Sequence, residues 1–391
     1  MTIIYFYQQQ IKLIKNNFKI FISATEQSGD NIGYNLIKEI IKKNNKIIFE
    51  GVGGEKMSRY LNKQFFSLND FNTMGIFEVL FSIRKFIKMI KYLANIIKNN
   101  NYDLIITIDS PDFNYPLIKK LRKYNYKNKA IHIVAPTVWA WRKNRAKKFS
   151  IVFDELLVLF NFEIKYFSQY GLKTTFIGHP VYYINKIQKI TKKDNVAFLA
   201  GSRLSELKSL LPYFKLAYEY LYVNKPNLII FFPTLPHLEK KIKIFVSDWK
   251  MKVIVVTKKE EIEKLYNFTT RAVVCSGTAS LEIAKMNIPQ IVIYKLNIFT
   301  ELIGKMFVKV KFANILNIVE DKLIIPEITN SSLNNAKFMN AFKNLLHDDT
   351  ENFNQLININ NALKKISSDH PPYSIAAKRV YENLISFSKA T

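Results

Sequence analysis

The sequence predicts an α/β protein built from two doubly wound domains, and three observations support this prediction. The chain has 391 residues, which is too long for one ordinary hydrophobic core. Short apolar runs that suit buried parallel strands alternate with segments of helical spacing along both halves. A polar, lysine-rich stretch at 185–194 separates the halves. We therefore expect an N-terminal extension at 1–17, a first domain at 18–185 and a second domain at 186–370.

Composition narrows the kinds of partner. A hydrophobic content of 48% indicates a globular chain, and 58 basic against 31 acidic residues give a net charge of +27. This charge attracts nucleic acid, acidic lipid or phosphorylated substrates, but the lysines are scattered and select none of these.

Cys275 is the only cysteine, so we expect a buried structural thiol and a reducing cytoplasm. No apolar run approaches the roughly 20 residues that span a bilayer, and residues 1–17 lack the pattern of a signal peptide.

In the first half, polar residues follow the predicted strands. The strand at 19–24 leads into a turn that contains Glu26 and Ser28, and the strand at 102–108 leads into Asp109 and Asp112. Open α/β sheets bind ligands at the carboxyl ends of their strands. Either aspartate is therefore a candidate general base, although capping of a turn or helix is the more frequent role for one such residue.

Two further segments of the first half have open interpretations. Trp139 and Trp141 lie beside a basic cluster that begins at Arg142. This pattern is typical either of an aromatic and cationic surface that binds a sugar or phosphate, or of side chains packed in the core. The stretch 74–97 has apolar residues at helical spacing and a basic polar face. Core packing is the expected role of this helix, and contact with an anionic membrane surface is the alternative.

The second half contains two junctions that suit phosphate. The strand at 195–199 leads into 201–203, and the strand at 272–275 leads into 276–278. Each junction precedes a predicted helix, whose first N–H groups and positive dipole end attract anions. Because both junctions are expected at one edge of one sheet, together they predict a site for a nucleotide diphosphate. No metal-binding motif, P-loop or nucleophile elbow is present.

Together these features resemble the lipid-A-disaccharide synthase family of inverting glycosyltransferases. The most specific segments are IDSPDFN at 108–114 and VWAWR at 138–142. Other matching segments follow in family order over roughly residues 20 to 330: 23–30, 51–54, 74–80, 162–163, 178–180, 201–206, 276–282, 294–295, Asn314 and 326–327. The departures from the family pattern are Thr25, Ala135, Ala200 and Ala313, and none removes a proposed chemical group.

The resemblance implies a fold and a reaction. The fold is the GT-B-type architecture, in which two Rossmann-like domains face each other across a cleft, with a C-terminal helix at 371–391 that packs back on the first domain. The reaction joins UDP-2,3-diacylglucosamine to the 6-hydroxyl of 2,3-diacylglucosamine 1-phosphate (lipid X). It forms the β-1,6-linked disaccharide 1-phosphate and UDP, with inversion and without a metal or other cofactor. This step belongs to lipid A and lipopolysaccharide biosynthesis of Gram-negative bacteria.

The resemblance also implies roles for particular residues. The catalytic residues are Asp109, as the base, and Glu26. The UDP-sugar is bound by Gly201, Ser202, Arg203, Ser276, Gly277, Thr278, Glu282 and Asn314. Of these, Arg203 is expected on the diphosphate and Glu282 on the ribose. The acceptor and lipid side comprises Ser28, Met74, Asp112, Trp139 and Arg142.

The implied location is the cytoplasmic face of the inner membrane, with the enzyme bound peripherally to anionic lipid as a monomer or homodimer. Nucleic acid is not an expected partner, because no recognisable binding motif accompanies the charge. The rival interpretations are another enzyme of the same architecture, such as a UDP-GlcNAc epimerase or the muramyl-pathway glucosaminyltransferase, and a degenerate membrane-docking relative. Retention of Asp109, Arg203 and Glu282 argues against the degenerate relative.

Overall fold

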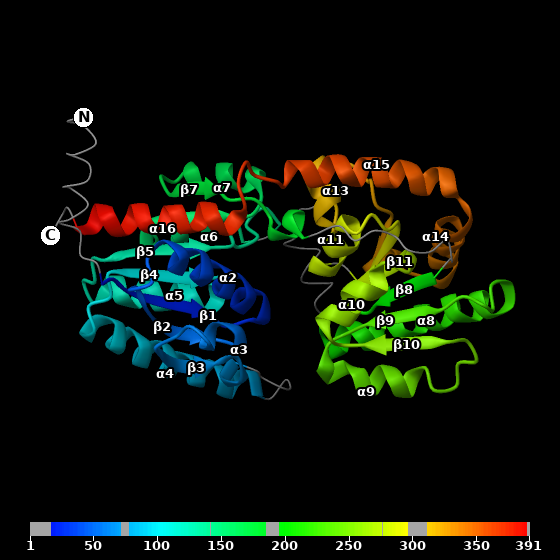
Figure 1. Ribbon diagram of the computed structural model, residues 1–391, viewed down its shortest axis with the longest axis horizontal. Helices are drawn as coiled ribbons and strands as arrows, with labels where there is room; N and C mark the ends of the chain where they lie inside the picture. The colour runs from blue at the N-terminus through cyan, green and yellow to red at the C-terminus, as the bar shows by residue number, and fades with distance from the viewer. Residues whose placement is uncertain are drawn as a thin grey trace. The chain divides into compact units, whose positions relative to one another are not determined.

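The computed structural model describes residues 17–71, 78–140, 142–184, 195–275, 277–295 and 311–388 (Figure 1). The chain forms two compact units. Unit 1 contains the described residues up to Pro180 and those from Ser368 onward, and unit 2 is Val181–Ser367. Each unit is built on a parallel sheet. The two predicted doubly wound domains are therefore present.

The sheet of unit 1 has seven parallel strands in the order β3-β2-β1-β4-β5-β6-β7. The strands are β1 Lys19–Ala24, β2 Ile48–Gly53, β3 Lys63–Ser67, β4 Leu104–Ile108, β5 Lys129–Ile133, β6 Glu155–Val158 and β7 Lys173–Phe176. The helices are α2 Gln27–Lys43, α3 Glu55–Ser58, α4 Glu78–Asn99, α5 Pro111–Lys123, α6 Asn144–Val152, α7 Ile164–Ser168 and α16 Pro372–Ser388. The strand order reverses between β1 and β4, which makes the carboxyl ends of these two strands the place where such sheets bind ligands.

Alternating strand residues build a core on each face of this sheet. Phe21 and Ile105 belong to the core that packs against α4, α5 and α6, whereas Ile20, Ile22 and Ile106 belong to the core that packs against α2 and α16. Because helices cover both faces of the sheet, the strand sequences are nearly continuous apolar runs.

The C-terminal helix α16 packs on α2 and is anchored by a buried carboxylate. Glu155 of β6 is fully buried and accepts hydrogen bonds from Nε and Nη2 of Arg379 at 2.6 and 2.9 Å. Asn383 and Thr175 donate two more bonds to the same carboxylate, at 2.8 and 2.9 Å. A buried charge is tolerated only with such complete pairing, so this cluster holds the end of the chain on unit 1.

The sheet of unit 2 has six parallel strands in the order β10-β9-β8-β11-β12-β13. The strands are β8 Asn195–Leu199, β9 Ile230–Pro233, β10 Val253–Val256, β11 Thr269–Cys275, β12 Gln290–Tyr294 and β13 Glu327–Thr329. The helices are α8 Leu204–Asn224, α9 Pro236–Phe245, α10 Lys259–Tyr266, α11 Thr278–Lys285, α13 Ile315–Glu320, α14 Asn335–His347 and α15 Asp349–Lys365. Here the order reverses between β8 and β11, the two strands that precede the predicted phosphate junctions.

The glycine-rich piece 51–54 begins inside a strand, because Gly51 and Gly53 belong to β2. A Cβ atom at Gly51 would lie 1.8 Å from the carbonyl oxygen of Ile22, so this glycine lets β2 lie close to β1. The sequence analysis missed the strands β3, β12 and β13. None of the described helices is long and apolar enough to cross a membrane.

Candidate active site

Four predicted or neighbouring polar residues meet at the reversal point of unit 1. The hydroxyl of Ser28 donates to Oδ2 of Asp109 at 3.3 Å, and the hydroxyl of Ser110 donates to Oε1 of Glu26 at 3.2 Å. Glu26 is the N-cap residue of α2, and Asp109 follows β4. The structure therefore brings together the acids and hydroxyl groups that the sequence placed after two separate strands.

The turn that carries Asp109 is held in an uncommon backbone conformation. Asp109 and Ser110 have φ angles of 53° and 45°, in the left-handed region that few residues other than glycine adopt. The backbone N–H of Ser110 donates to Oδ1 of Asp109 at 2.8 Å, and the N–H of Asp109 bonds to the carbonyl of Ile133 at 2.9 Å. A strained backbone conformation of this kind persists only where several surrounding contacts hold it, and such places are often functional sites.

Asn114 stabilises this turn, and the sequence analysis did not select it. Its buried amide donates to the carbonyl of Asp109 at 2.8 Å and accepts from the hydroxyl of Ser23 at 2.9 Å. Asn114 ends the IDSPDFN segment, and its place one turn inside α5 was the available signal. Its contacts fix the backbone of Asp109, while the carboxylate remains half-exposed.

Asp112 lies on the first turn of α5 and is paired with two arginines. Its carboxylate contacts Nη2 of Arg145, and Nη1 of Arg142 lies 3.7 Å away. The side chain of Asp112 is 77% exposed. The structure thus connects two of the predicted acceptor-side residues, Asp112 and Arg142, to each other.

Trp139 follows β5 and is half-buried. Its indole N–H donates to Oε1 of Glu163 at 3.3 Å, and its ring meets that of Phe162 edge to face at 5.6 Å between centroids. Met74 and Trp141 lie outside the described residues, so their positions remain predictions.

The first predicted phosphate junction of unit 2 differs from our expectation. The N–H groups of Ser202 and Arg203 both donate to Oε2 of Glu206, at 2.9 and 3.1 Å. Nη1 of Arg203 donates to Oε1 of the same residue at 3.3 Å. Gly201 has a φ of +89°, and a Cβ there would lie 2.4 Å from Oε2 of Glu206. The two N–H groups are therefore engaged by Glu206, and the guanidinium of Arg203, 72% exposed, is the donor that this junction presents.

The second junction presents an open helix N-terminus. Gly277 is the N-cap of α11 with a φ of +137°, and a Cβ at that position would meet no atom within 4 Å. Thr278 is exposed at the first position of the helix. Ser276 lies outside the described residues. This end of α11 has room for an anion and the dipole to attract it.

Glu282 lies one turn further along α11 and is half-buried. Burial raises its pKa; Lys259 opposes this and Glu263 adds to it. Among the described residues no hydrogen bond reaches its carboxylate. A carboxylate that can still accept hydrogen bonds suits sugar hydroxyl groups, which donate them.

Asn314, by contrast, makes its contacts inside unit 2. Its Oδ1 accepts from the N–H of Leu316 at 2.9 Å and caps α13, while its Nδ2 donates to the hydroxyl of Ser280 at 2.6 Å. The side chain is buried. It therefore connects α13 to α11, the helix that carries Gly277 and Glu282.

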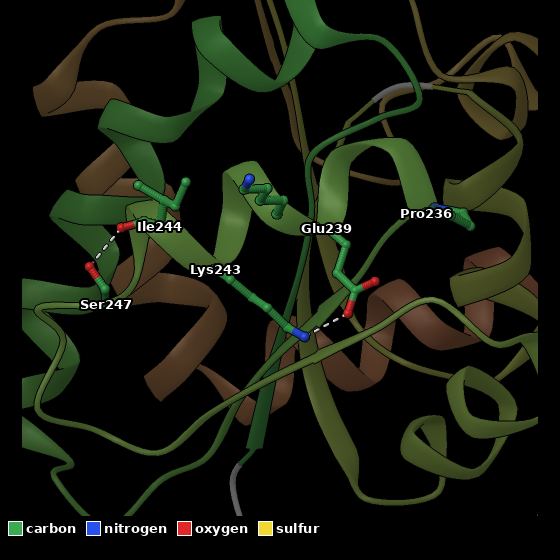
Figure 2. Close-up of a pocket in the computed structure, with 6 residues that line it drawn as sticks. Pro236, Glu239, Lys243, Ile244 and Ser247 are labelled. Atoms are coloured by element: carbon green, nitrogen blue, oxygen red, sulfur yellow. Dashed lines mark hydrogen bonds and ion pairs between the residues drawn. The ribbon is translucent and has the colours of Figure 1, made fainter.

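Other features of the described residues carry no site. They contain no group of three or more His, Cys, Asp or Glu side chains that could hold a metal. Burial raises the pKa of the Cys275 thiol to about 12, with Glu206 adding and Arg203 opposing, so this cysteine is an inert core residue as predicted. A hollow of about 560 Å³ lies along α9. Figure 2 shows two of the residues that line it, Lys243 and Glu239, which form an ion pair with a 2.7 Å separation. None of the predicted site residues lines it.

Two parallel-sheet domains, each with polar groups where its strand order reverses, are the fold of the two-domain, GT-B-type glycosyltransferase class. Solved structures share the fold. They include a putative UDP-N-acetylglucosamine 2-epimerase from Listeria monocytogenes, with a TM-score of 0.60, 12% identity and coverage of 96% of this chain and 97% of that one. MurG from Acinetobacter baumannii gives a TM-score of 0.59 and 11% identity, with 94% and 99% covered.

The sequence identifies the family within this class. Residues 20–373 match the family described as Lipid-A-disaccharide synthetase. Lipid-A-disaccharide synthase from Rickettsia felis is 35% identical over 381 residues, which cover 94% of this chain and 97% of the relative. The corresponding enzyme from Gluconobacter oxydans is 32% identical, with 84% and 81% covered. The chain belongs to the lipid-A-disaccharide synthase family and is a glycosyltransferase, which confirms the predicted family and enzyme class.

Proposed function

We propose that this protein transfers the diacylglucosamine of UDP-2,3-diacylglucosamine to the 6-hydroxyl of 2,3-diacylglucosamine 1-phosphate. The products are the β-1,6-linked disaccharide 1-phosphate and UDP. Beyond family membership, the observation that carries this proposal is the geometry of Asp109. Its half-exposed carboxylate is oriented by Ser28 and by its own turn at the ligand-binding edge of unit 1.

In the proposed mechanism Asp109 is the general base. Its carboxylate takes the proton of the acceptor 6-hydroxyl as that oxygen forms a bond to C1 of the donor sugar. The bond between C1 and the UDP oxygen breaks on the opposite face, which inverts the configuration. A positioned base of this kind contributes about 10²- to 10⁴-fold to the rate.

The donor side must stabilise the negative charge that develops on UDP. We assign this to the guanidinium of Arg203, the N-terminus of α11 and the hydroxyl of Thr278. Glu282 would hold the ribose hydroxyl groups. The contacts described for Gly201, Ser202 and Asn314 stay within unit 2. We therefore assign these residues to shaping the donor site rather than to contacting the diphosphate.

On the acceptor side, Glu26 supports the Asp109 turn through Ser110. Asp112 is engaged by two arginines, so we assign it to holding Arg142 and Arg145 near the acceptor phosphate rather than to proton transfer. The reaction as proposed needs no metal, and we expect full activity in excess EDTA. Activity lost in EDTA and restored by a divalent cation would contradict that part of the proposal.

The test is release of UDP from UDP-2,3-diacylglucosamine in detergent micelles, with and without the acceptor. We expect acceptor-dependent release by the wild type and a loss of about 10²- to 10⁴-fold in Asp109→Asn. Asp112→Asn is the matched control and should keep its kcat within about tenfold. Wild-type activity retained in Asp109→Asn, or a larger loss in Asp112→Asn, would move the base to Asp112. Release without acceptor would favour a different sugar-nucleotide enzyme.

We further propose that the enzyme docks peripherally on the cytoplasmic face of an anionic membrane through α4. One side of the helix packs in the core through residues such as Met89 and Leu93, while Ile83, Ile87 and Tyr92 are 49%, 59% and 52% exposed. Arg84, Lys85 and Lys88, together with Phe66, Met89 and Tyr92, line a hollow of about 600 Å³. Exposed apolar side chains among cations suit the interface of an acidic bilayer.

Flotation with vesicles that contain anionic lipid tests this docking. Lys85→Glu combined with Lys88→Glu should abolish flotation. Lys240→Glu combined with Lys241→Glu on α9 changes the net charge equally and should not affect it. Equal effects of the two pairs would show attraction through total charge rather than docking by α4.

A further inference from the structure

The buried carboxyl group that contacts Trp139 has no role in the mechanism proposed above. Glu163 ends the short 3-10 helix Asn161–Glu163 after β6 and is 3% exposed. Its Oε2 accepts a hydrogen bond from the backbone N–H of Phe160 at 3.2 Å. Its Oε1 accepts from the indole N–H of Trp139 at 3.3 Å. The two oxygens thus connect the segment after β6 to the turn after β5.

Aromatic rings extend this connection to β7. Phe160 stacks on Phe162 at 5.7 Å and on His179 at 5.3 Å between ring centroids. Phe162 in turn meets Trp139 edge to face. Glu163 therefore belongs to a small layer built from the carboxyl ends of three neighbouring strands, the same edge of the sheet that carries Asp109.

An ionised carboxyl group at this buried position costs free energy, which a neutral side chain in a purely structural contact would not. Burial raises the pKa of Glu163 to about 8, and the hydrogen bonds from Trp139 and the backbone only partly oppose this rise. N–H donors of Trp139 and of the backbone at Phe160 and Leu159 converge on it, and only the ionised carboxylate, present above about pH 8, offers them two acceptor oxygens. A glutamine has one acceptor oxygen, so it leaves at least one of these donors facing its own NH₂ group.

We propose that Glu163 is a positioning residue for the acceptor, which acts by holding the indole of Trp139 and with it the turn at 135–140. The proposal rests on the function proposed above and on the place of Trp139 on the acceptor side, which the family resemblance implies. Glu163 itself touches no reacting atom. Its effect is on where the acceptor binds relative to Asp109.

A double-mutant cycle on acceptor kinetics tests the proposal. Trp139→Phe keeps an aromatic ring but lacks the N–H, and Glu163→Gln keeps the volume of the side chain. At about pH 9, where the carboxylate of Glu163 is ionised, we expect each variant to raise the KM for the acceptor by about five- to tenfold, the scale of one lost hydrogen bond, with the KM for the donor within about twofold of wild type. The double variant should be no worse than the poorer single variant, because both changes break the same contact.

Tryptophan emission provides a readout that needs no substrate. The difference in emission between wild type and Trp139→Phe isolates the signal of Trp139 among the three tryptophans. This signal should change with a midpoint near pH 8 in the wild type, where Glu163 titrates, and should be flat in Glu163→Gln. His179, the other titratable group of the layer, does not interfere, since burial lowers its pKa to about 4.

Independent, multiplicative effects of the two substitutions on the acceptor KM would overturn the proposal, as would equal increases in the donor KM. If Glu163→Gln fails to fold, Trp139→Phe alone must still raise the acceptor KM. A wild type without acceptor-dependent UDP release would contradict the proposed function. The emission titration would in that case still decide whether Glu163 holds Trp139.

Discussion

The hydroxyl of Ser28 donates a hydrogen bond to Oδ2 of Asp109 at 3.3 Å. Ser28 lies on the first turn of α2 after β1, and Asp109 follows β4, so 81 positions of sequence separate the two residues. They meet because β1 pairs directly with β4 at the point where the strand order reverses. The bond orients the proposed base without hiding it from an acceptor.

Loss of this bond should slow the reaction without abolishing it. We expect Ser28→Ala to lower kcat by about three- to tenfold, since one hydrogen bond that orients the carboxylate is lost while the base remains. Steady-state kinetics with saturating donor and acceptor measure this effect. A fall as large as that of Asp109→Asn would show that Ser28 does more than orient the base.

Glu206→Gln should weaken donor binding. The carboxylate bonds two backbone N–H groups of the 201–203 turn and the guanidinium of Arg203. An amide cannot hold all three, so Arg203 would lose its fixed orientation toward the diphosphate. We expect the KM for the UDP-sugar to rise about five- to tenfold, with the acceptor KM unchanged. Glu239→Gln, which breaks an exposed ion pair on α9, is the control and should change neither KM. An unchanged donor KM in Glu206→Gln would show that this carboxylate is dispensable.

Arg379→Ala should destabilise unit 1 strongly. It leaves Glu155 buried without its main partner, and removal of one member of a buried ion pair costs about 3–5 kcal/mol. Arg59→Ala, which removes an exposed pair with Glu55, should cost less than about 1 kcal/mol. Denaturant unfolding measures both. Equal costs would mean that α16 is not held by this cluster.

The same cluster predicts a pH dependence. Burial alone would raise the pKa of Glu155, but hydrogen bonds from Arg379, Asn383 and Thr175 outweigh it, and the pKa is lowered from 4.5. A carboxyl whose folded-state pKa lies below its unfolded value stabilises the fold above the unfolded pKa and loses this contribution as pH falls. The difference in unfolding free energy between wild type and Arg379→Ala should therefore shrink as pH falls below about 4.5. A difference that grows on acidification would contradict this assignment.

His132 should make stability fall on mild acidification. It is fully buried on β5, Thr107 contacts its Nδ1 at 2.7 Å, and burial lowers its pKa to about 3 against an opposing backbone hydrogen bond at Val134. The neutral ring is required in the fold, so the contribution is complete above pH 6.5 and is lost as pH falls toward 3. At about 1.4 kcal/mol per pH unit, acidification from pH 6.5 to about pH 5 costs about 2 kcal/mol.

Unfolding in denaturant at several pH values checks this slope. His179 adds a similar slope, because burial lowers its pKa as well. Burial raises the pKa of Glu163, which gives a slope of opposite sign over the same range. The loss of stability from pH 6.5 to about pH 5 should therefore be about 2 kcal/mol smaller in His132→Asn than in the wild type. An unchanged slope in that variant would assign the acid sensitivity to other groups.

Several features were predictable because they depend on short stretches of chain. The βα units appeared as apolar runs followed by polar turns, and the segments IDSPDFN and VWAWR identified the family. The strands β12 and β13 were missed because short buried runs such as Gln290–Tyr294 and Glu327–Thr329 lack a period of their own. The role of Gly51 was not predictable from the sequence, because it depends on the backbone of Ile22 on the neighbouring strand.

The sequence by itself determined the fold class, the family and the candidate chemical groups, since these follow from local patterns and from motifs that survive in order along the chain. Only the tertiary structure decided which groups act together. It paired Ser28 with Asp109, Asp112 with Arg145, Glu206 with the 201–203 turn, and Glu163 with Trp139. The physical reason is that hydrogen bonds and ion pairs act over about 3 Å in space, whereas strand order and helix packing decide which distant residues come that close.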